Sequence, residues 1–179
     1  FFTSGIQSVE DLRQLITSIQ EGNHPLFEEG TTTSFFAYSI GAFLAQIMML
    51  TYGESLLSTS RLFILCGGAP FNRMNGVSKL IMDEEAFSRL RFYYLRQFDR
   101  ELNSKGNIFQ MTNKQPAAMA FSSMLDAANL REWRNSRFKR MEDRIQVIGM
   151  KNDIIIPPDG IKEIIDSGQL TIIDYPSGY

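Results

Sequence analysis

Apolar residues occur along this chain in two patterns, short nearly continuous runs and longer runs with helical spacing. The short runs are typical of strands buried in a parallel sheet. They are Thr31–Ala37, Arg61–Cys66, Arg144–Gly149 and Leu170–Asp174. Helical spacing predicts helices at Val9–Glu21, Gly41–Tyr52 and Pro158–Ser167. Because strands alternate with helices, the pattern predicts an α/β fold with a mostly parallel sheet of about four strands, covered on both faces.

The segment 69–143 has no strand pattern and is far longer than an ordinary crossover between strands. Helical spacing predicts three helices in it, at about Asp83–Leu102, Pro116–Ala128 and Leu130–Met141. With Arg144 it holds 14 of the 18 Lys and Arg residues but 9 of the 20 acidic residues, a net charge of +5. We expect a helical cap inserted over the carboxyl edge of the sheet, which divides the chain into 1–68, 69–143 and 144–179.

Composition narrows the class of protein without naming a partner. The 179 residues are 44% hydrophobic and 21% charged, as in an ordinary globular domain, and the net charge is −2. One basic helix contains a tryptophan, but the chain is acidic and has no nucleic-acid-binding motif, so we expect no nucleic-acid partner. The apolar run Phe35–Leu50 is interrupted by polar side chains and a strand-to-helix break, which argues against a membrane span. The cellular compartment stays open, since the chain opens at Phe1 and a signal peptide cannot be assessed.

Cysteine and histidine are too few for a metal site or an internal disulfide. The single cysteine, Cys66, ends an apolar run and is expected as a small buried side chain. The single histidine, His24, lies between Gly22 and Pro25 and is expected in an exposed loop. We therefore expect no metal and no cofactor.

Ser39 lies where a strand-type run changes directly into a helix-type run. The sequence there reads Ala37-Tyr38-Ser39-Ile40-Gly41, with small residues two positions on either side of the serine. A serine on such a tight turn is held in strained backbone geometry, and the start of the helix supplies free N–H groups. The pattern predicts a nucleophile on a strand–turn–helix corner, facing a cavity under the cap. The alternative is a buried strand and helix with an incidental serine.

A second candidate group follows the third predicted strand. The stretch Gly149–Asp153 leads from that strand into Ile154–Pro157. Ligands and catalytic groups collect at the carboxyl ends of parallel strands, so we expect Asp153 on the same sheet edge as Ser39. The alternative is an aspartate that only shapes the turn. Asp159 is a weaker candidate, because it lies in the first turn of the next predicted helix.

In this order the motifs resemble the α/β-hydrolase family. Ala37–Ala42 is similar to the nucleophile turn after the family's fifth strand, Arg61–Cys66 to its sixth strand, and 69–143 to the lid inserted there. Arg144–Pro157 resembles the seventh strand with its acid loop, and Leu170–Tyr179 the eighth strand, which leads to the catalytic histidine. The resemblance implies a partial α/β-hydrolase fold, the C-terminal portion of the family architecture.

The resemblance also implies a function and roles for three residues. The protein would be a serine hydrolase that acts on an ester, thioester or amide carbonyl of a small acyl substrate. Ser39 would be the nucleophile, the backbone N–H of Ile40 would form half of the oxyanion hole, and Asp153 would orient the catalytic imidazole.

Two features depart from the family pattern. The family builds four strands before the nucleophile turn, whereas 30 residues precede Thr31, and its histidine falls beyond Tyr179. His24 precedes Ser39 and is in the wrong order for the triad. We therefore expect the C-terminal half of a longer hydrolase that is inactive by itself, with the missing half or another chain paired to the strand Thr31–Ala37.

Two other functions stay open. A hydrolase-like binding or interaction module, without catalysis, would also lack the histidine. A flavodoxin-like domain is disfavoured by the long helical segment and the loopless corner at Ser39. The large apolar side chains of the cap are expected mainly as packing, and otherwise as the lining of an acyl pocket. They are Phe92, Tyr93, Tyr94, Phe98, Met111, Met119, Phe121 and Met124.

Overall fold

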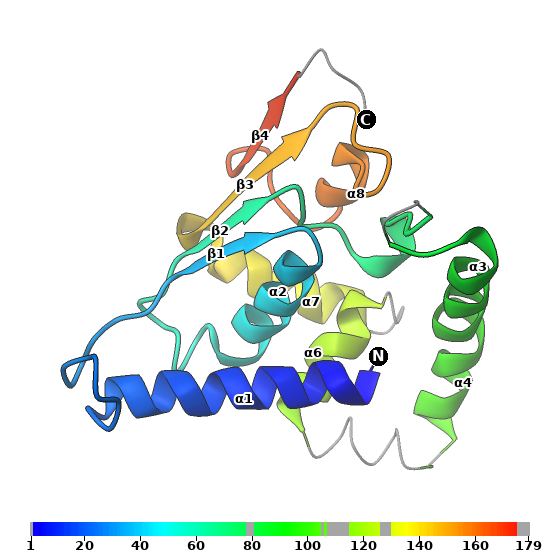
Figure 1. Ribbon diagram of the computed structural model, residues 1–179. Coiled ribbons are helices and arrows are strands. Elements are labelled where there is room, and N and C mark those ends of the chain that lie inside the picture. Colours follow the sequence, from blue (N-terminus) through cyan, green and yellow to red (C-terminus); the bar gives the residue numbers. More distant parts are fainter. Residues whose placement is uncertain (1, 78–80, 105, 107–114, 126–129, 175–179) are drawn as a thin grey trace.

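The computed structural model describes residues 2–77, 81–104, 106, 115–125 and 130–174 (Figure 1). Its strands are β1 Phe35–Tyr38, β2 Leu62–Leu65, β3 Ile145–Met150 and β4 Leu170–Ile173. Its α-helices are α1 Phe2–Gln20, α2 Ile40–Tyr52, α3 Glu84–Phe92, α4 Phe98–Asn103, α6 Pro116–Met124, α7 Arg131–Arg140 and α8 Pro158–Ile161. A π-helical segment, Tyr93–Gln97, joins α3 to α4, and 3₁₀ turns lie at Phe71–Arg73 and Glu142–Arg144.

The four strands form one parallel sheet in the order β1-β2-β3-β4. This confirms the predicted α/β fold with four parallel strands. β1 begins at Phe35 and not at Thr31, because the turn after α1 extends to Thr31, whose N–H and hydroxyl both donate to the carbonyl of Glu28.

In the part of the chain that the structure describes, the helices cover one face of the sheet, which corrects the prediction that both faces are covered. The side chains of Ala37, Ile64 and Val147 point to the covered face and are at most 6% exposed. On the opposite face Phe36 is 70% exposed and Tyr38 57%. The strand order explains this, because right-handed crossovers between strands added in one direction all pass the same face.

β1 is an edge strand within the described part of the chain. Phe35 N–H donates to the carbonyl of Arg61 and Ser39 N–H to that of Leu65. Backbone groups alternate in direction along a strand, so the N–H and C=O groups of Phe36 and Tyr38 point away from β2. The open face and this open edge therefore meet along β1.

α2 is the centre of the covered face. Its segment Ile47–Leu50 is fully buried, and α1, α6 and α7 all pack against it. The helix is apolar on all sides because it lies inside the protein and not at its surface. Phe121 of α6 connects α2 with α1. The centroid of its ring lies 5.5 Å from that of Phe43 and 5.1 Å from that of Phe2.

The helices predicted within 69–143 are present, and they pack in two places (Figure 1). α6 and α7 lie under the sheet against α2. The α3–α4 stretch stands to one side, where Phe87 and Tyr94 pack on the ring of Phe71 just after β2. The part of the segment that resembles a cap is therefore α3–α4.

The start of α1 and the end of α8 differ most from the predicted bounds. α1 begins at Phe2 and not at Val9, so Ser8 lies inside the helix, where its hydroxyl donates to the carbonyl of Ser4. Gly22, with φ of 70°, ends the helical turn. α8 ends at Ile161, earlier than the predicted Ser167.

Arg144 joins the sheet to the loop that follows α2. Its guanidinium donates to the carbonyls of Leu57 at 2.7 Å, Ser60 at 3.2 Å and Gly53 at 2.8 Å. These carbonyls lie after the end of α2, where helical partners are missing. One side chain therefore fixes the path from α2 into β2.

We expect Gly67→Ala to destabilise the fold. A Cβ built on Gly67 would overlap the Cβ of Ala42 in α2 and lie 3.0 Å from Cγ2 of Ile64. Overpacking of this kind costs about 1–3 kcal/mol. Urea unfolding of the full-length protein measures the loss. Gly168→Ala is the control, because a Cβ there meets nothing within 4 Å and should leave the free energy of unfolding unchanged.

Candidate active site

Ser39 lies on the corner between β1 and α2 with no loop on either side. Its φ is 51° and its ψ is −122°, a conformation that L residues rarely adopt. The residue also borders a cavity. The predicted strand–turn–helix corner with a strained serine is therefore confirmed.

The close packing at this corner involves a different glycine from the one expected. A Cβ on Gly41 would meet nothing within 4 Å, so the structure gives no steric reason for a small residue there. Gly67 is the residue that allows α2 to approach the sheet, since a Cβ on it would overlap Ala42 and lie 3.3 Å from the carbonyl oxygen of Ser39. Ala37 is buried on the covered face, as a small residue before the corner requires.

Ile40 is the first residue of α2. The N–H groups in the first turn of a helix have no carbonyl acceptor within the helix. Ile40 is 64% exposed, so the first turn of α2 begins near the surface directly after Ser39. The backbone N–H of Ile40 is therefore a helix-start donor beside the serine.

Cys66 occupies the equivalent position at the end of the neighbouring strand. Tyr38 pairs with Leu65, so Ser39 and Cys66 follow the last paired residues of their strands. Cys66 also has a positive φ, of 49°. Burial and, to a smaller extent, the negative charge of Asp153 raise the pKa of the Cys66 thiol. The sequence predicted a buried side chain here, whereas Cys66 is half-buried.

Asp153 lies in the turn after β3, on the same edge of the sheet as Ser39, as predicted. Its Oδ1 accepts the N–H of Ile155 at 2.8 Å and that of Ile156 at 2.9 Å, so it shapes this turn. Within the described residues no donor reaches its Oδ2. The influence of Asp153 on Cys66 places its charge beside the end of β2.

An apolar cavity of about 280 Å³ joins these elements. It is bordered by Ser39 and Ile40 at the corner, and its apolar walls come from α2, the segment after β2, α3 and the Asp153 loop. The wall residues are Phe43, Phe71, Met74, Ile81, Met82, Phe87, Leu90, Ile155 and Ile156. The Asn75 N–H donates to the carbonyl of Ile155 at 2.7 Å, which holds two of these walls together.

None of the cap residues considered from the sequence that the structure describes lines this cavity. Tyr94, Phe98 and Phe121 belong to the aromatic packing between helices, in agreement with the expectation that the cap side chains are mainly packing. Met111 lies outside the described residues. Sequence reasoning missed Phe43, although its place one turn after Ser39 on α2 was a signal. Phe71 and Phe87 gave no signal, because only the packing of α3 brings them to the serine.

His24 does not approach Ser39. It lies in the loop between α1 and β1, on the amino side of the strand whose carboxyl end carries the serine. Its Nδ1 accepts the N–H of Leu26 and its ring packs on Phe27. His24 is the only histidine of the sequence, so residues 1–179 bring no imidazole to the serine.

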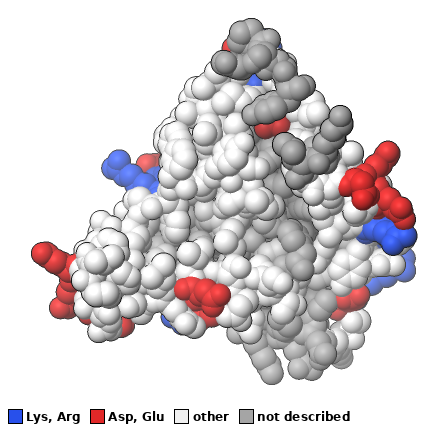
Figure 2. All heavy atoms as spheres, in the orientation of Figure 1, with Lys and Arg blue, Asp and Glu red and all other residues white. Residues whose placement is uncertain are grey.

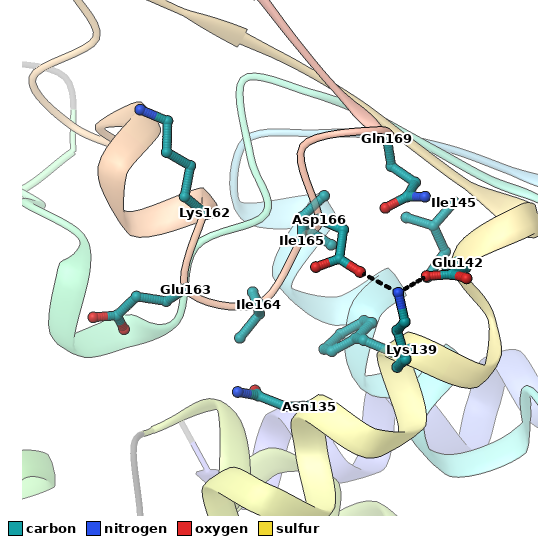
Figure 3. A pocket seen from close by; sticks show the side chains of 11 residues that line it. Asn135, Lys139, Glu142, Ile145, Lys162, Glu163, Ile164, Ile165, Asp166 and Gln169 are labelled. Carbon is teal, nitrogen blue, oxygen red and sulfur yellow. Dashed lines mark hydrogen bonds and ion pairs between the residues drawn. The ribbon is translucent and has the colours of Figure 1, made fainter.

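A second hollow, of about 220 Å³, lies at the opposite end of the sheet between α7 and the segment after α8 (Figure 3). Its central cation, Lys139, is paired with Asp166 at 2.8 Å and Glu142 at 2.5 Å. These carboxylates raise the pKa of the Lys139 ammonium, so its charge is already matched. Neither Ser39 nor Asp153 borders this hollow.

Two features are absent from the part of the chain that the structure describes. It contains no group of three or more His, Cys, Asp or Glu residues that could hold a metal ion. None of its helices is both long and apolar enough to cross a membrane.

The fold and this site define a parallel α/β protein with a strained serine at the carboxyl end of its edge strand, beside an apolar cavity. Residues 1–175 match a family described as "Family of unknown function (DUF6051)", and the chain belongs to that family. No curated protein matches the chain. The family description names no activity, so the resemblance to α/β hydrolases stays a prediction.

We expect Asp153→Asn to increase the reactivity of Cys66. The amide keeps an oxygen acceptor for Ile155 and Ile156 but removes the charge that helps to raise the pKa of the thiol. The pH midpoint of alkylation by iodoacetamide should therefore fall, while burial keeps it above that of a free cysteine.

Cys66 is the only cysteine, so mass spectrometry reports this rate without interference. Asp159→Asn is the matched control, since Asp159 is paired with Lys162 and does not influence Cys66. An unchanged midpoint in Asp153→Asn would contradict the placement of the Asp153 charge beside Cys66.

Proposed function

We propose that this chain carries the nucleophile and the acid of a serine hydrolase that acts on an ester, thioester or amide of an acyl compound. The observation that carries the proposal is the backbone of Ser39, with φ of 51° at a strand-to-helix corner that opens on an apolar cavity. A strained conformation of a non-glycine residue persists where the surrounding structure holds it, and such residues cluster at active sites. Asp153, on the same sheet edge, supports the proposal.

In the first step the Ser39 oxygen attacks the carbonyl carbon of the substrate while an imidazole takes the hydroxyl proton. The negative charge that develops on the carbonyl oxygen is stabilised by the N–H of Ile40. The imidazolium then gives its proton to the leaving alcohol, thiol or amine, which leaves an acyl group on Ser39. Attack by water, with the same proton transfers, releases the acid and regenerates the serine.

Asp153 accepts the N–H of the imidazole in this mechanism. Its Oδ1 is held by the amides of Ile155 and Ile156, which fixes the direction of the carboxylate and leaves Oδ2 for the ring. The two uses of Asp153, as a turn-forming residue and as the acid, are therefore compatible.

The imidazole comes from polypeptide outside residues 1–179, since His24 precedes the amino end of β1 and Ser39 follows its carboxyl end. We propose that part of the same protein supplies it and also covers the open edge and face of the sheet. An unpaired parallel edge with Phe36 and Tyr38 exposed is a surface that native proteins cover. Among the described residues visible in Figure 2, most charged side chains lie toward the rim of the surface, and the atoms between them are mostly uncharged.

We expect the full-length protein to hydrolyse a p-nitrophenyl ester and Ser39→Ala to lose roughly a thousandfold or more in kcat. Loss of the nucleophile removes the covalent step while the fold is kept. Ser58→Ala, on an exposed serine after α2, is the matched control and should keep full activity. Residues 1–179 alone should show no turnover.

Covalent labelling gives a second measurement of the same proposal. A fluorophosphonate should add to Ser39 in the full-length protein, as read by peptide mass spectrometry, and Ser58→Ala should not alter that labelling. Equal ester hydrolysis by Ser39→Ala and the unsubstituted protein would rule out Ser39 as the nucleophile. Absence of both hydrolysis and labelling would favour the non-catalytic binding module.

We expect the amide groups of Phe36 and Tyr38 to exchange slowly with solvent deuterium in the full-length protein. A neighbouring strand would bond these outward-pointing groups and protect them. In residues 1–179 alone the same amides should exchange fast, while Ile64 in the adjacent strand stays protected. Fast exchange in the full-length protein would contradict a covered edge, and protection only above a threshold protein concentration would assign the cover to a second chain.

A further inference from the structure

We propose that the cavity beside Ser39 binds an uncharged acyl chain of medium length, which makes the hydrolase selective for medium-chain acyl substrates. The proposal rests on the serine-hydrolase function above and adds the substrate class. Three parts of the chain that are distant in sequence converge on one apolar space, and Ser39 lies at its border.

The size of the cavity sets the length of the chain. Its volume is about 280 Å³. A methylene group is close in size to a water molecule, whose share of liquid volume is about 30 Å³, so the cavity holds roughly nine non-hydrogen atoms. This corresponds to an acyl chain of about eight to ten carbons, since the carbonyl itself lies at Ser39.

The lining sets the chemistry of the chain. None of the described lining residues is Asp, Glu, Lys, Arg or His, and the polar side chains among them are those of Ser39 and Asn75. The Asn75 Oδ1 already accepts the N–H of Val77. A charged or strongly polar chain would lose its water without a partner, so the cavity selects apolar groups.

The arrangement of buried and exposed walls sets the direction of the chain. Ile40 and Ile81, at 64% and 54% exposure, mark the open side beside the serine. Phe43, Phe71 and Phe87 are at most 5% exposed and form the inner walls. The acyl carbonyl therefore lies at the mouth, and the end of the chain lies among the rings.

Phe87 forms a rigid wall because its ring lies directly on the backbone of Gly76. A Cβ built on Gly76 would be 2.7 Å from Cδ2 of this ring. The ring also meets Phe71 at 6.3 Å between centroids. The inner end of the cavity is consequently fixed, and a chain that is too long has to leave part of itself in water.

The test is a series of p-nitrophenyl esters from acetyl to palmitoyl with the full-length protein. Each methylene that enters the cavity should raise kcat/KM by up to about fourfold, as expected for burial of a methylene group. The rise should stop near eight to ten carbons. Leu90→Trp, which adds bulk to a half-buried wall on α3, should move the maximum to shorter esters.

Leu12→Trp is the matched control, since Leu12 is also half-buried but lies on α1 outside the cavity. It should leave the chain-length profile unchanged. Thermal unfolding of both variants checks that they are folded. Gly76→Ala is a second change to the cavity wall, because the added methyl group displaces the Phe87 ring and should also shift the maximum.

Binding of 1-nonanol to the Ser39→Ala variant, followed by calorimetry, separates the pocket from the catalysis. If no ester is hydrolysed but 1-nonanol binds and Leu90→Trp weakens that binding, the apolar pocket stands and the hydrolase function fails. If esters are hydrolysed without dependence on chain length, or Leu90→Trp behaves like Leu12→Trp, the hydrolase function stands and the acyl-chain pocket is overturned. Absence of both hydrolysis and binding overturns both.

Discussion

The handedness of the connections between parallel strands decides most of what this structure looks like. The strands are added in one direction, β1 to β4, and each right-handed crossover returns over the same face. All helices that pack on the sheet therefore cover Ala37, Ile64 and Val147, while Phe36 and Tyr38 on the other face stay exposed. One rule of chain geometry explains the dense core and the bare face together.

The same rule brings the chemistry to one edge. In a parallel sheet every strand ends on the same side, so the corner at Ser39, the bend at Cys66 and the turn at Asp153 become neighbours although 114 residues separate the first from the last. Positive φ values at Ser39 and Cys66 show that the chain turns sharply as it leaves the first two strands. Gly67 allows α2 to start directly at the end of β1, because a larger residue would push α2 away from the sheet.

The cavity depends on a different kind of constraint, the packing of aromatic rings. The rings of Phe87 and Tyr94 from the α3–α4 stretch both pack against that of Phe71. The Tyr94 hydroxyl accepts a hydrogen bond from the backbone N–H of Phe2 at the start of α1. Burial raises the pKa of the Tyr94 hydroxyl, which keeps it neutral at this contact. These contacts fix the α3–α4 stretch both to the segment after β2 and to α1. The apolar cavity beside Ser39 lies between this stretch and the rest of the core.

The sequence by itself determined the local structure and the order of the elements. Runs such as Leu62–Leu65 read as buried strands because parallel strands are apolar on both sides, and the abrupt change at Ser39 predicted the corner because strand and helix spacing meet there without a loop. The sheet edge that Asp153 shares with Ser39 also followed from alternation of strands and helices. The start of α1 was missed, because Ser8 looks like a capping residue and local propensity yields to the packing of Phe2 and Ile6.

Only the tertiary structure decided what surrounds the serine and what is left uncovered. Phe71 and Phe87 become cavity walls through contacts between residues that are distant in sequence, and no spacing along the chain encodes them. Gly41 and Gly67 are both glycines close to Ser39 in space, yet an added methyl group would collide only at Gly67. The collision depends on how closely α2 approaches β2, which the sequence does not show. The uncovered face of the sheet could not be predicted from the sequence either, because it also depends on the arrangement of the elements in space. The sequence of Phe36 and Tyr38 is that of a buried strand, and whether a layer covers them depends on the order of strands in space.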